Sequence, residues 1–170
     1  MQNPFAHLRR EWCRTRKNGA VTGMIVLGVI WLIVLLMVGS PRFFLWMIAS
    51  RVAVCPSWLL MLLLSVLFLI SGFSIGLVLG NRGRGMDAFK YRGAFFFVIG
   101  VTLCYLWYAL FFEARLLLIA SLLALIGIVC FAVSAVNFRC VFRLASVGMW
   151  ISFVIGCYLS FFSFLCFFSL

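Results

Sequence analysis

The stretch SWLLMLLLSVLFLISGFSIGLVL, residues 57–79, decides the fold of this chain. A helix needs about 20 apolar residues to cross the hydrocarbon core of a bilayer, and this stretch meets that length without a single charged residue. A segment inside lipid must satisfy its own backbone hydrogen bonds, and an α-helix does so. The sequence therefore predicts a transmembrane helix here.

Four further apolar stretches are of similar length, and hydrophobic residues make up 67% of the 170-residue chain. A soluble domain of this size could not bury so much apolar surface. The repeated short alternating strands of a membrane β-barrel are not seen. We therefore predict an all-α integral membrane protein in which residues 19–170 form one bundle of five transmembrane helices. The predicted spans are 20–39, 57–79, 93–112, 116–136 and 144–168.

The net charge of +11 comes from basic residues that are unevenly placed between the spans. Eleven of the 14 lie before the first span, between the second and third, or between the fourth and fifth. The other three are Arg42, Arg51 and Arg115, on the opposite side. The positive-inside rule then places the basic arm, residues 1–18, in the cytoplasm and the C-terminus outside. We expect a cell membrane, such as that of a bacterium, as the location, with the basic residues meeting anionic lipid and not nucleic acid.

Groups that could perform catalysis are scarce. The chain has one histidine, His7, and three acids, Glu11, Asp87 and Glu113, none near the middle of a span. Ion-coupled transporters usually place an ionisable residue there, and no acid pair or Ser–His–Asp set can be assembled. The seven cysteines also lack the clustered spacing of metal ligands or of a disulfide framework. We predict no catalytic residue, no metal site and no ordinary enzyme activity.

Small residues recur at every fourth position in the second and fifth spans, so each set lies on one helix face. Such faces let helix backbones approach closely in lipid, and they fit either packing inside the bundle or a homodimer interface. Leu77, beside Gly76, is expected to face lipid or a looser contact. The two sets are Gly72, Gly76 and Gly80, and Gly148, Ser152, Gly156 and Ser160; a shorter pair is Gly19 and Gly23.

Aromatic residues are numerous, with 20 Phe, 6 Trp and 4 Tyr. Trp12 and Trp31 are assigned to the interfacial belt of membrane proteins. Trp107 with Phe111, and Trp150 with Phe153, are spaced to share a helix face. Such faces, with Trp58 and Phe68 of the second span, could line one apolar cavity suited to a flat hydrophobic ligand. The alternative is that these rings pack against lipid and one another.

Three segments, over roughly residues 46–165, resemble the translocator protein family, the tryptophan-rich sensory proteins. The segment in the third predicted span has the spacing of the family's Asn-x-x-Trp-Ser-x-x-Phe-Phe motif, with the asparagine and the serine replaced. The segment in the fifth predicted span has the spacing of the family's Pro-Tyr-x-x-Trp-x-x-Phe motif, with Ser146 and Val147 in place of Pro-Tyr. The matching residues are Pro56, Trp58, Phe68, Ile70 and Gly72 in the second span; Cys104, Trp107, Tyr108, Phe111 and Phe112 in the third; and Trp150 and Phe153 in the fifth.

The resemblance implies a five-helix bundle, often dimeric, that binds a tetrapyrrole such as protoporphyrin, or in some members a sterol or an aromatic drug. It also implies that spans two, three and five meet around the pocket. The carboxylates of a porphyrin would have to reach the rim of this pocket, where Arg51 on the outer loop is a candidate partner. We expect a membrane receptor or carrier for such a ligand. The alternative is a substrate-binding or accessory membrane subunit of a larger transporter. The candidate ligand-binding residues are Trp58, Phe68, Trp107, Phe111, Trp150, Phe153 and Arg51.

Overall fold

The computed structural model describes residues 17–38, 57–80 and 87–168, and in this part of the chain all regular structure is helical. Four of the helices are long and apolar enough to cross a membrane, and the apolar part of the other, Gly19–Val34, is shorter. The prediction of an apolar all-α protein is confirmed for these residues. The helices are α2 (Lys17–Val38), α4 (Ser57–Gly80), α5 (Asp87–Phe112), α6 (Leu117–Val141) and α7 (Arg143–Phe168).

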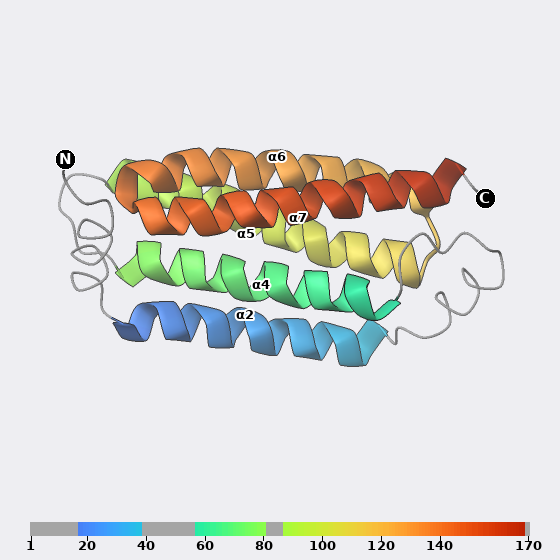
Figure 1. Cartoon of the computed structure of the whole chain (residues 1–170), viewed down its shortest axis with the longest axis horizontal. Helices are drawn as coiled ribbons and strands as arrows, with labels where there is room; N and C mark the ends of the chain where they lie inside the picture. The colour runs from blue at the N-terminus through green and yellow to red at the C-terminus, as the bar shows by residue number, and fades with distance from the viewer. Residues whose placement is uncertain (1–16, 39–56, 81–86, 169–170) are drawn as a thin grey trace.

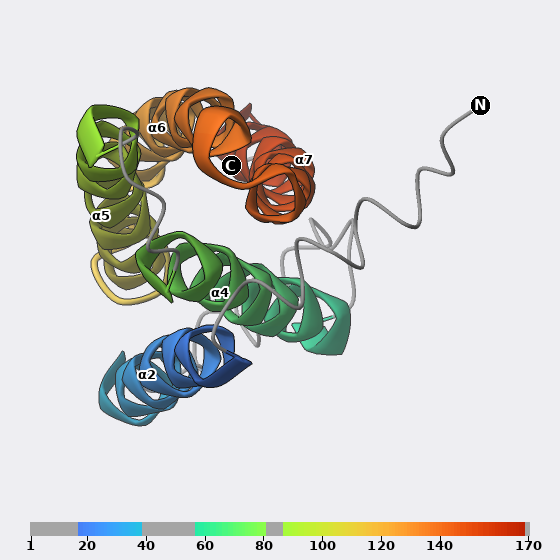
Figure 2. The same cartoon turned by 90° about the vertical axis from the view of Figure 1, so that its left-hand side faces the viewer.

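The helices run back and forth along one axis, so that the start of α2 and the end of α7 lie at opposite ends of the bundle (Figure 1). Helix α4 packs against α2 and α7, and α6 packs against α5 and α7. Helix α5 makes only sparse contacts with α2 and α4. Seen along the axis, α4, α5, α6 and α7 form a ring of four helices, and α2 lies outside it against α4 (Figure 2).

Two helices extend beyond the predicted spans by more than one turn. Helix α5 begins at Asp87 and not at 93, and α6 continues past 136 to Val141. The added segments contain charged residues, and two of these suit the helix dipole: Asp87 lies in the first turn of α5 and Arg139 in the last turn of α6. The helices therefore continue past the hydrocarbon layer expected from hydropathy alone.

The connections after α5 and α6 are short. The expected tight turn near Glu113 is present, and within it Arg115 adopts a left-handed backbone conformation with φ of 55°. Between α6 and α7 only Phe142 leaves the helical conformation, with φ of −156° and ψ of 111°. Consecutive helices in this half of the molecule are therefore antiparallel neighbours.

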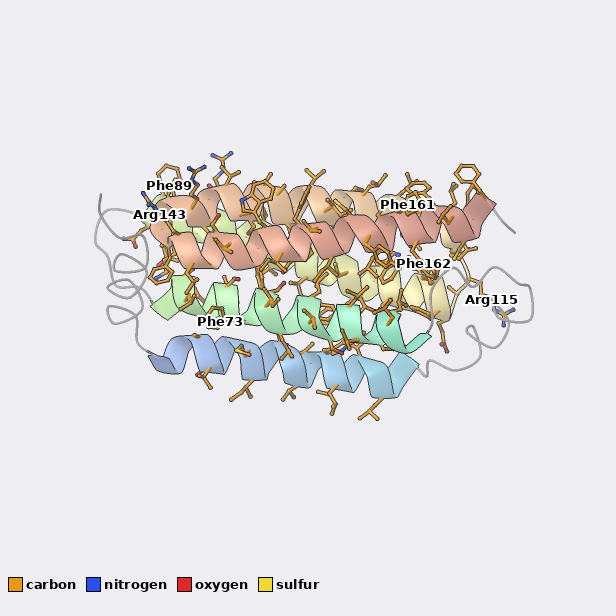
Figure 3. All side chains as sticks on the ribbon, viewed as in Figure 1. Phe73, Phe89, Arg115, Arg143, Phe161 and Phe162 are labelled. Carbon is orange, nitrogen blue, oxygen red and sulfur yellow. The ribbon has the colours of Figure 1, made fainter. Side chains whose placement is uncertain are left out.

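Charged and apolar side chains are arranged as in a membrane protein. Arg143 and Arg115 lie at opposite ends of the bundle (Figure 3). Between the ends, large apolar side chains such as Phe95, Val129 and Phe161 are exposed along the helices. Exposed apolar surface of this extent indicates contact with lipid. The side of the membrane on which each end lies stays a prediction.

Helices α2 and α4 meet through their glycines. A Cβ atom added to Gly76 would lie 2.9 Å from Cα of Ala20 and would overlap the carbonyl oxygen of Gly19. A Cβ added to Gly72 would lie 3.0 Å from Cα of Met24. The glycine face of α4 therefore packs inside the bundle, against the shorter glycine pair of α2. A homodimer through small-residue helix faces stays a prediction.

The small-residue face of α7 also packs inside the bundle. The Oγ atoms of Ser152 and Ser71 of α4 are hydrogen-bonded at 3.0 Å. A Cβ at Gly148 would meet the side chain of Ser74, and one at Gly156 would lie 3.2 Å from Cγ1 of Ile128 on α6. This face therefore holds α7 against both α4 and α6.

Of the two expectations for Leu77, that it faces lipid or a looser contact, the first is wrong, because its side chain is only 1% exposed. Helix α4 has α2 on one side, α7 on another and the end of α5 nearby, so a residue one position away from the glycine face still lies inside the bundle.

Candidate functional site

Four aromatic rings meet where α2, α4 and α5 come together: Trp31, Phe68, Tyr105 and Tyr108, here called the aromatic seam. Phe68 and Tyr105 are stacked almost in parallel, with ring centroids 4.6 Å apart and an angle of 3° between planes. Trp31 is stacked 4.8 Å from Phe68 and meets Tyr108 edge-on at 5.1 Å. Offset stacks and edge contacts are the favourable arrangements of aromatic rings.

The seam contains residues that the sequence analysis did not select. Trp31 was expected in the interfacial belt, but its side chain is buried, and its Nε1 donates to Oγ of Ser65 at 3.0 Å. Its position, four residues after Leu27 and eight after Gly23, places it on the helix face that meets α4. That spacing from the glycine pair is the signal that could have identified it.

The two tyrosine hydroxyls of the seam, those of Tyr105 and Tyr108, are buried and have no hydrogen-bond partner. By contrast, the indole nitrogen of Trp107 donates to Oγ of Ser163 at 2.9 Å. A buried polar group without a partner costs about 1–3 kcal/mol. Two such hydroxyls beside a parallel ring stack make the seam the strongest candidate for binding a polar atom of a ligand.

The predicted pair Trp107 and Phe111 belongs to a second ring cluster toward the C-terminal end of α5. The two rings are stacked with centroids 5.4 Å apart, and Phe111 lies 6.0 Å from Phe162 of α7. All three side chains are buried. These rings of α5 and α7 therefore pack against one another inside the bundle.

The other predicted pair lies in different surroundings. Trp150 meets Phe153 edge-on at 5.3 Å, and the Trp150 side chain is 42% exposed. The side chain of Trp58 and the whole of Arg51 lie outside the described residues. Of the predicted site residues, Phe68 contributes to the aromatic seam and Trp107 and Phe111 to the second cluster. Their shared role in ligand binding stays a hypothesis.

A groove with a volume of about 540 Å³ runs along the contact of α2 and α4, beside α5. We call it the inner groove. Its lining is apolar apart from the hydroxyl of Thr22, and glycines of both helices form part of it. The lining residues are Gly19, Thr22, Gly23, Val26, Leu27, Ile75, Gly76, Leu79, Gly80 and Phe97.

Metal-binding groups are not gathered in the described residues, where no three His, Cys, Asp or Glu side chains lie close enough to hold an ion. The described cysteines, Cys104, Cys130, Cys140, Cys157 and Cys166, do not form disulfide bonds with one another. Within this part of the chain, the aromatic seam and the inner groove are the candidate binding regions that carry no charged side chain in their rings or lining.

The fold and these clusters define a helical membrane protein with a buried aromatic cluster. Comparison with protein-family models, curated proteins and solved structures finds no match to this chain. Membership of the translocator protein family therefore stays a prediction from the motifs.

Proposed function

We propose that this protein binds a flat hydrophobic ligand, for example a tetrapyrrole, at the aromatic seam and acts as a membrane receptor or carrier for it. The observation that carries the proposal is the pair of buried, unpartnered hydroxyls on Tyr105 and Tyr108 beside the parallel stack of Phe68 and Tyr105. Rings and hydroxyl donors together are suited to a ligand that is planar and bears a hydrogen-bond acceptor.

The seam is also the place where α5 is joined to α2 and α4 mainly through aromatic side chains. Helix α5 is packed extensively against α6 but only sparsely against α2 and α4. The rings of Trp31 on α2 and Phe68 on α4 contact the ring of Tyr105 on α5. A flat ligand that enters between them replaces ring–ring contacts with ring–ligand contacts of the same kind.

Selectivity at such a site must come from geometry and hydrogen bonds. A hydrophobic ligand that moves from lipid into the bundle gains little from the hydrophobic effect, because the lipid is already apolar. Each hydroxyl that finds an acceptor contributes about 0.5–1.5 kcal/mol. The tyrosines of the seam would therefore distinguish a ligand with an acceptor group from a lipid chain.

The test uses the purified protein in lipid nanodiscs and protoporphyrin as the probe. Binding is expected to quench tryptophan fluorescence, because Trp31 lies within the seam. Tyr105→Phe and Tyr108→Phe keep the rings and remove the hydroxyls, and each should weaken binding by about 2- to 10-fold. Tyr91→Phe is the matched control, since Tyr91 lies on the same helix with its side chain 67% exposed; it should bind as the parent does.

Stability separates a ligand-binding role from a packing role. If the hydroxyls have no partner in the ligand-free protein, Tyr108→Phe should leave its stability unchanged or raise it while weakening binding. Binding at parental strength by both phenylalanine variants would contradict the proposal. A loss of tenfold or more in the double variant Trp107→Ala, Trp150→Ala, with no change in the tyrosine variants, would place the ligand at the originally predicted rings instead.

A further inference from the structure

The inner groove has the length and lining of a site for one acyl chain. Along α2 it extends from Gly19 to Leu27, which is about 12 Å at 1.5 Å per residue. Half of a typical hydrocarbon core is about 15 Å. The groove begins near the end of the bundle where α2 starts and α4 finishes, and it reaches toward the middle of the apolar region.

An acyl chain gains no hydrophobic free energy by moving from the bilayer into this groove. An empty groove, however, would leave its lining atoms without van der Waals partners. A lipid chain therefore fills the groove readily but binds there with little preference of its own. Any preference for one lipid over another must come from the headgroup.

A positive charge lies at the end of the groove where the headgroup would be. Nζ of Lys90 donates to the carbonyl oxygen of Leu79 at 3.3 Å, and Leu79 and Gly80 line the groove. The first turn of α5 also contains the exposed acid Asp87, and Arg92 follows Lys90 on the same helix. Basic groups between helices at a membrane surface are suited to the phosphate of an anionic lipid.

We infer that the inner groove holds one acyl chain of an anionic phospholipid whose phosphate is bound by Lys90. The ammonium group has three N–H donors and can bind more than one oxygen at a time. This inference does not depend on a ligand at the aromatic seam, because the seam and the groove are lined by different residues.

The test is native mass spectrometry of the full-length protein released from micelles that contain phosphatidylglycerol and phosphatidylcholine with identical chains. The parent should retain one lipid and prefer phosphatidylglycerol by about fivefold, the effect expected of one basic group at the surface. Lys90→Gln should remove that preference. Arg92→Gln is the matched control on the same helix, since residues two positions apart do not face the same way, and it should keep the preference.

A second pair of variants tests the groove itself. Val26 lines the groove with its side chain 49% exposed, so Val26→Trp should fill the groove from its rim and reduce retention of both lipids. Val29 lies on the same helix, is 51% exposed and does not line the groove, so Val29→Trp should retain lipid as the parent does. Lys90 and Val26 both act on one bound lipid. The double variant Lys90→Gln, Val26→Trp should therefore lose less phosphatidylglycerol retention than the losses of the two single variants added together.

Three results would overturn the inference. They are an unchanged lipid preference in Lys90→Gln, an equal loss of preference in Arg92→Gln, and parental retention of both lipids in Val26→Trp. The second would show general attraction of anionic lipid to the surface, and the third would show that the chain does not occupy the groove.

Discussion

Replacing Gly76 by alanine should separate α2 from α4. An added Cβ would lie 2.9 Å from Cα of Ala20 and 3.0 Å from the carbonyl carbon of Gly19, and would overlap that residue's oxygen. All three neighbours are backbone atoms, which cannot turn aside as a side chain could. The helices must therefore move apart along their whole glycine contact.

Gly28→Ala provides the reference for the size of this effect. A Cβ there would lie 3.4 Å from Cδ2 of Leu69, which is ordinary van der Waals contact. Both substitutions gain the higher helix propensity of alanine, up to about 1 kcal/mol, so this term cancels in the comparison. Overpacking costs about 1–3 kcal/mol, and we expect Gly76→Ala to be less stable than Gly28→Ala by that amount.

The measurement is reversible unfolding in mixed micelles, with an increasing proportion of a denaturing detergent and the helix content followed by circular dichroism. Gly23→Ala should behave like Gly76→Ala, because a Cβ there would lie 3.0 Å from Cα of Gly76. Equal stability of Gly76→Ala and Gly28→Ala would show that the two helix backbones are not in close contact, and the reasoning would fail.

Three further predictions concern packing and topology. Ser134→Ala should lower stability by about 0.6–1.7 kcal/mol, because Oγ of Ser134 donates across helices to the carbonyl oxygen of Gly93 at 2.6 Å; Ser121→Ala, which removes a bond within one helix, should change stability less. Gly93→Ala should destabilise through contacts of 2.6 and 2.7 Å with the Phe138 ring, whereas Gly127→Ala, whose nearest neighbour would be 3.7 Å away, should not; unfolding in mixed micelles measures both pairs. Reporter fusions at the two chain termini should label opposite faces of the membrane, and labelling of the same face would contradict the predicted topology.

The helices were predictable because lipid leaves a long apolar segment little choice of structure. The close approach of backbones was also predictable, because glycines four residues apart share a helix face. Which helix packs against that glycine face was not predictable from the sequence. Gly72 and Gly76 could have met a second copy of the chain, and only the structure shows them against Gly19 and Gly23.

The rotation of each helix about its own axis limited the prediction of the site. In a chain that is apolar on all sides, hydrophobic periodicity does not show which face points inward. Trp31 was therefore assigned to the membrane interface although it is buried in the aromatic seam, and Trp150 was grouped with Trp107 although its side chain is 42% exposed. The unpartnered hydroxyls of Tyr105 and Tyr108 depend on the arrangement of three helices, and no spacing in the sequence reports it.

The way the contacts are distributed among pairs of helices has a consequence for how the chain assembles during synthesis. Helix α2 finds its main partner in α4, and α5, α6 and α7 are joined in sequence order, so most contacts form between consecutive helices of the described chain. The first pair can associate while the last three helices are still being made, and those three can then fold by adding one neighbour at a time. The contact of α4 with α7, which includes the bond between Ser71 and Ser152, is the main one that must wait for the final helix. From this arrangement we expect the serine-lined contact between α4 and α7, which joins the two halves of the molecule, to form last.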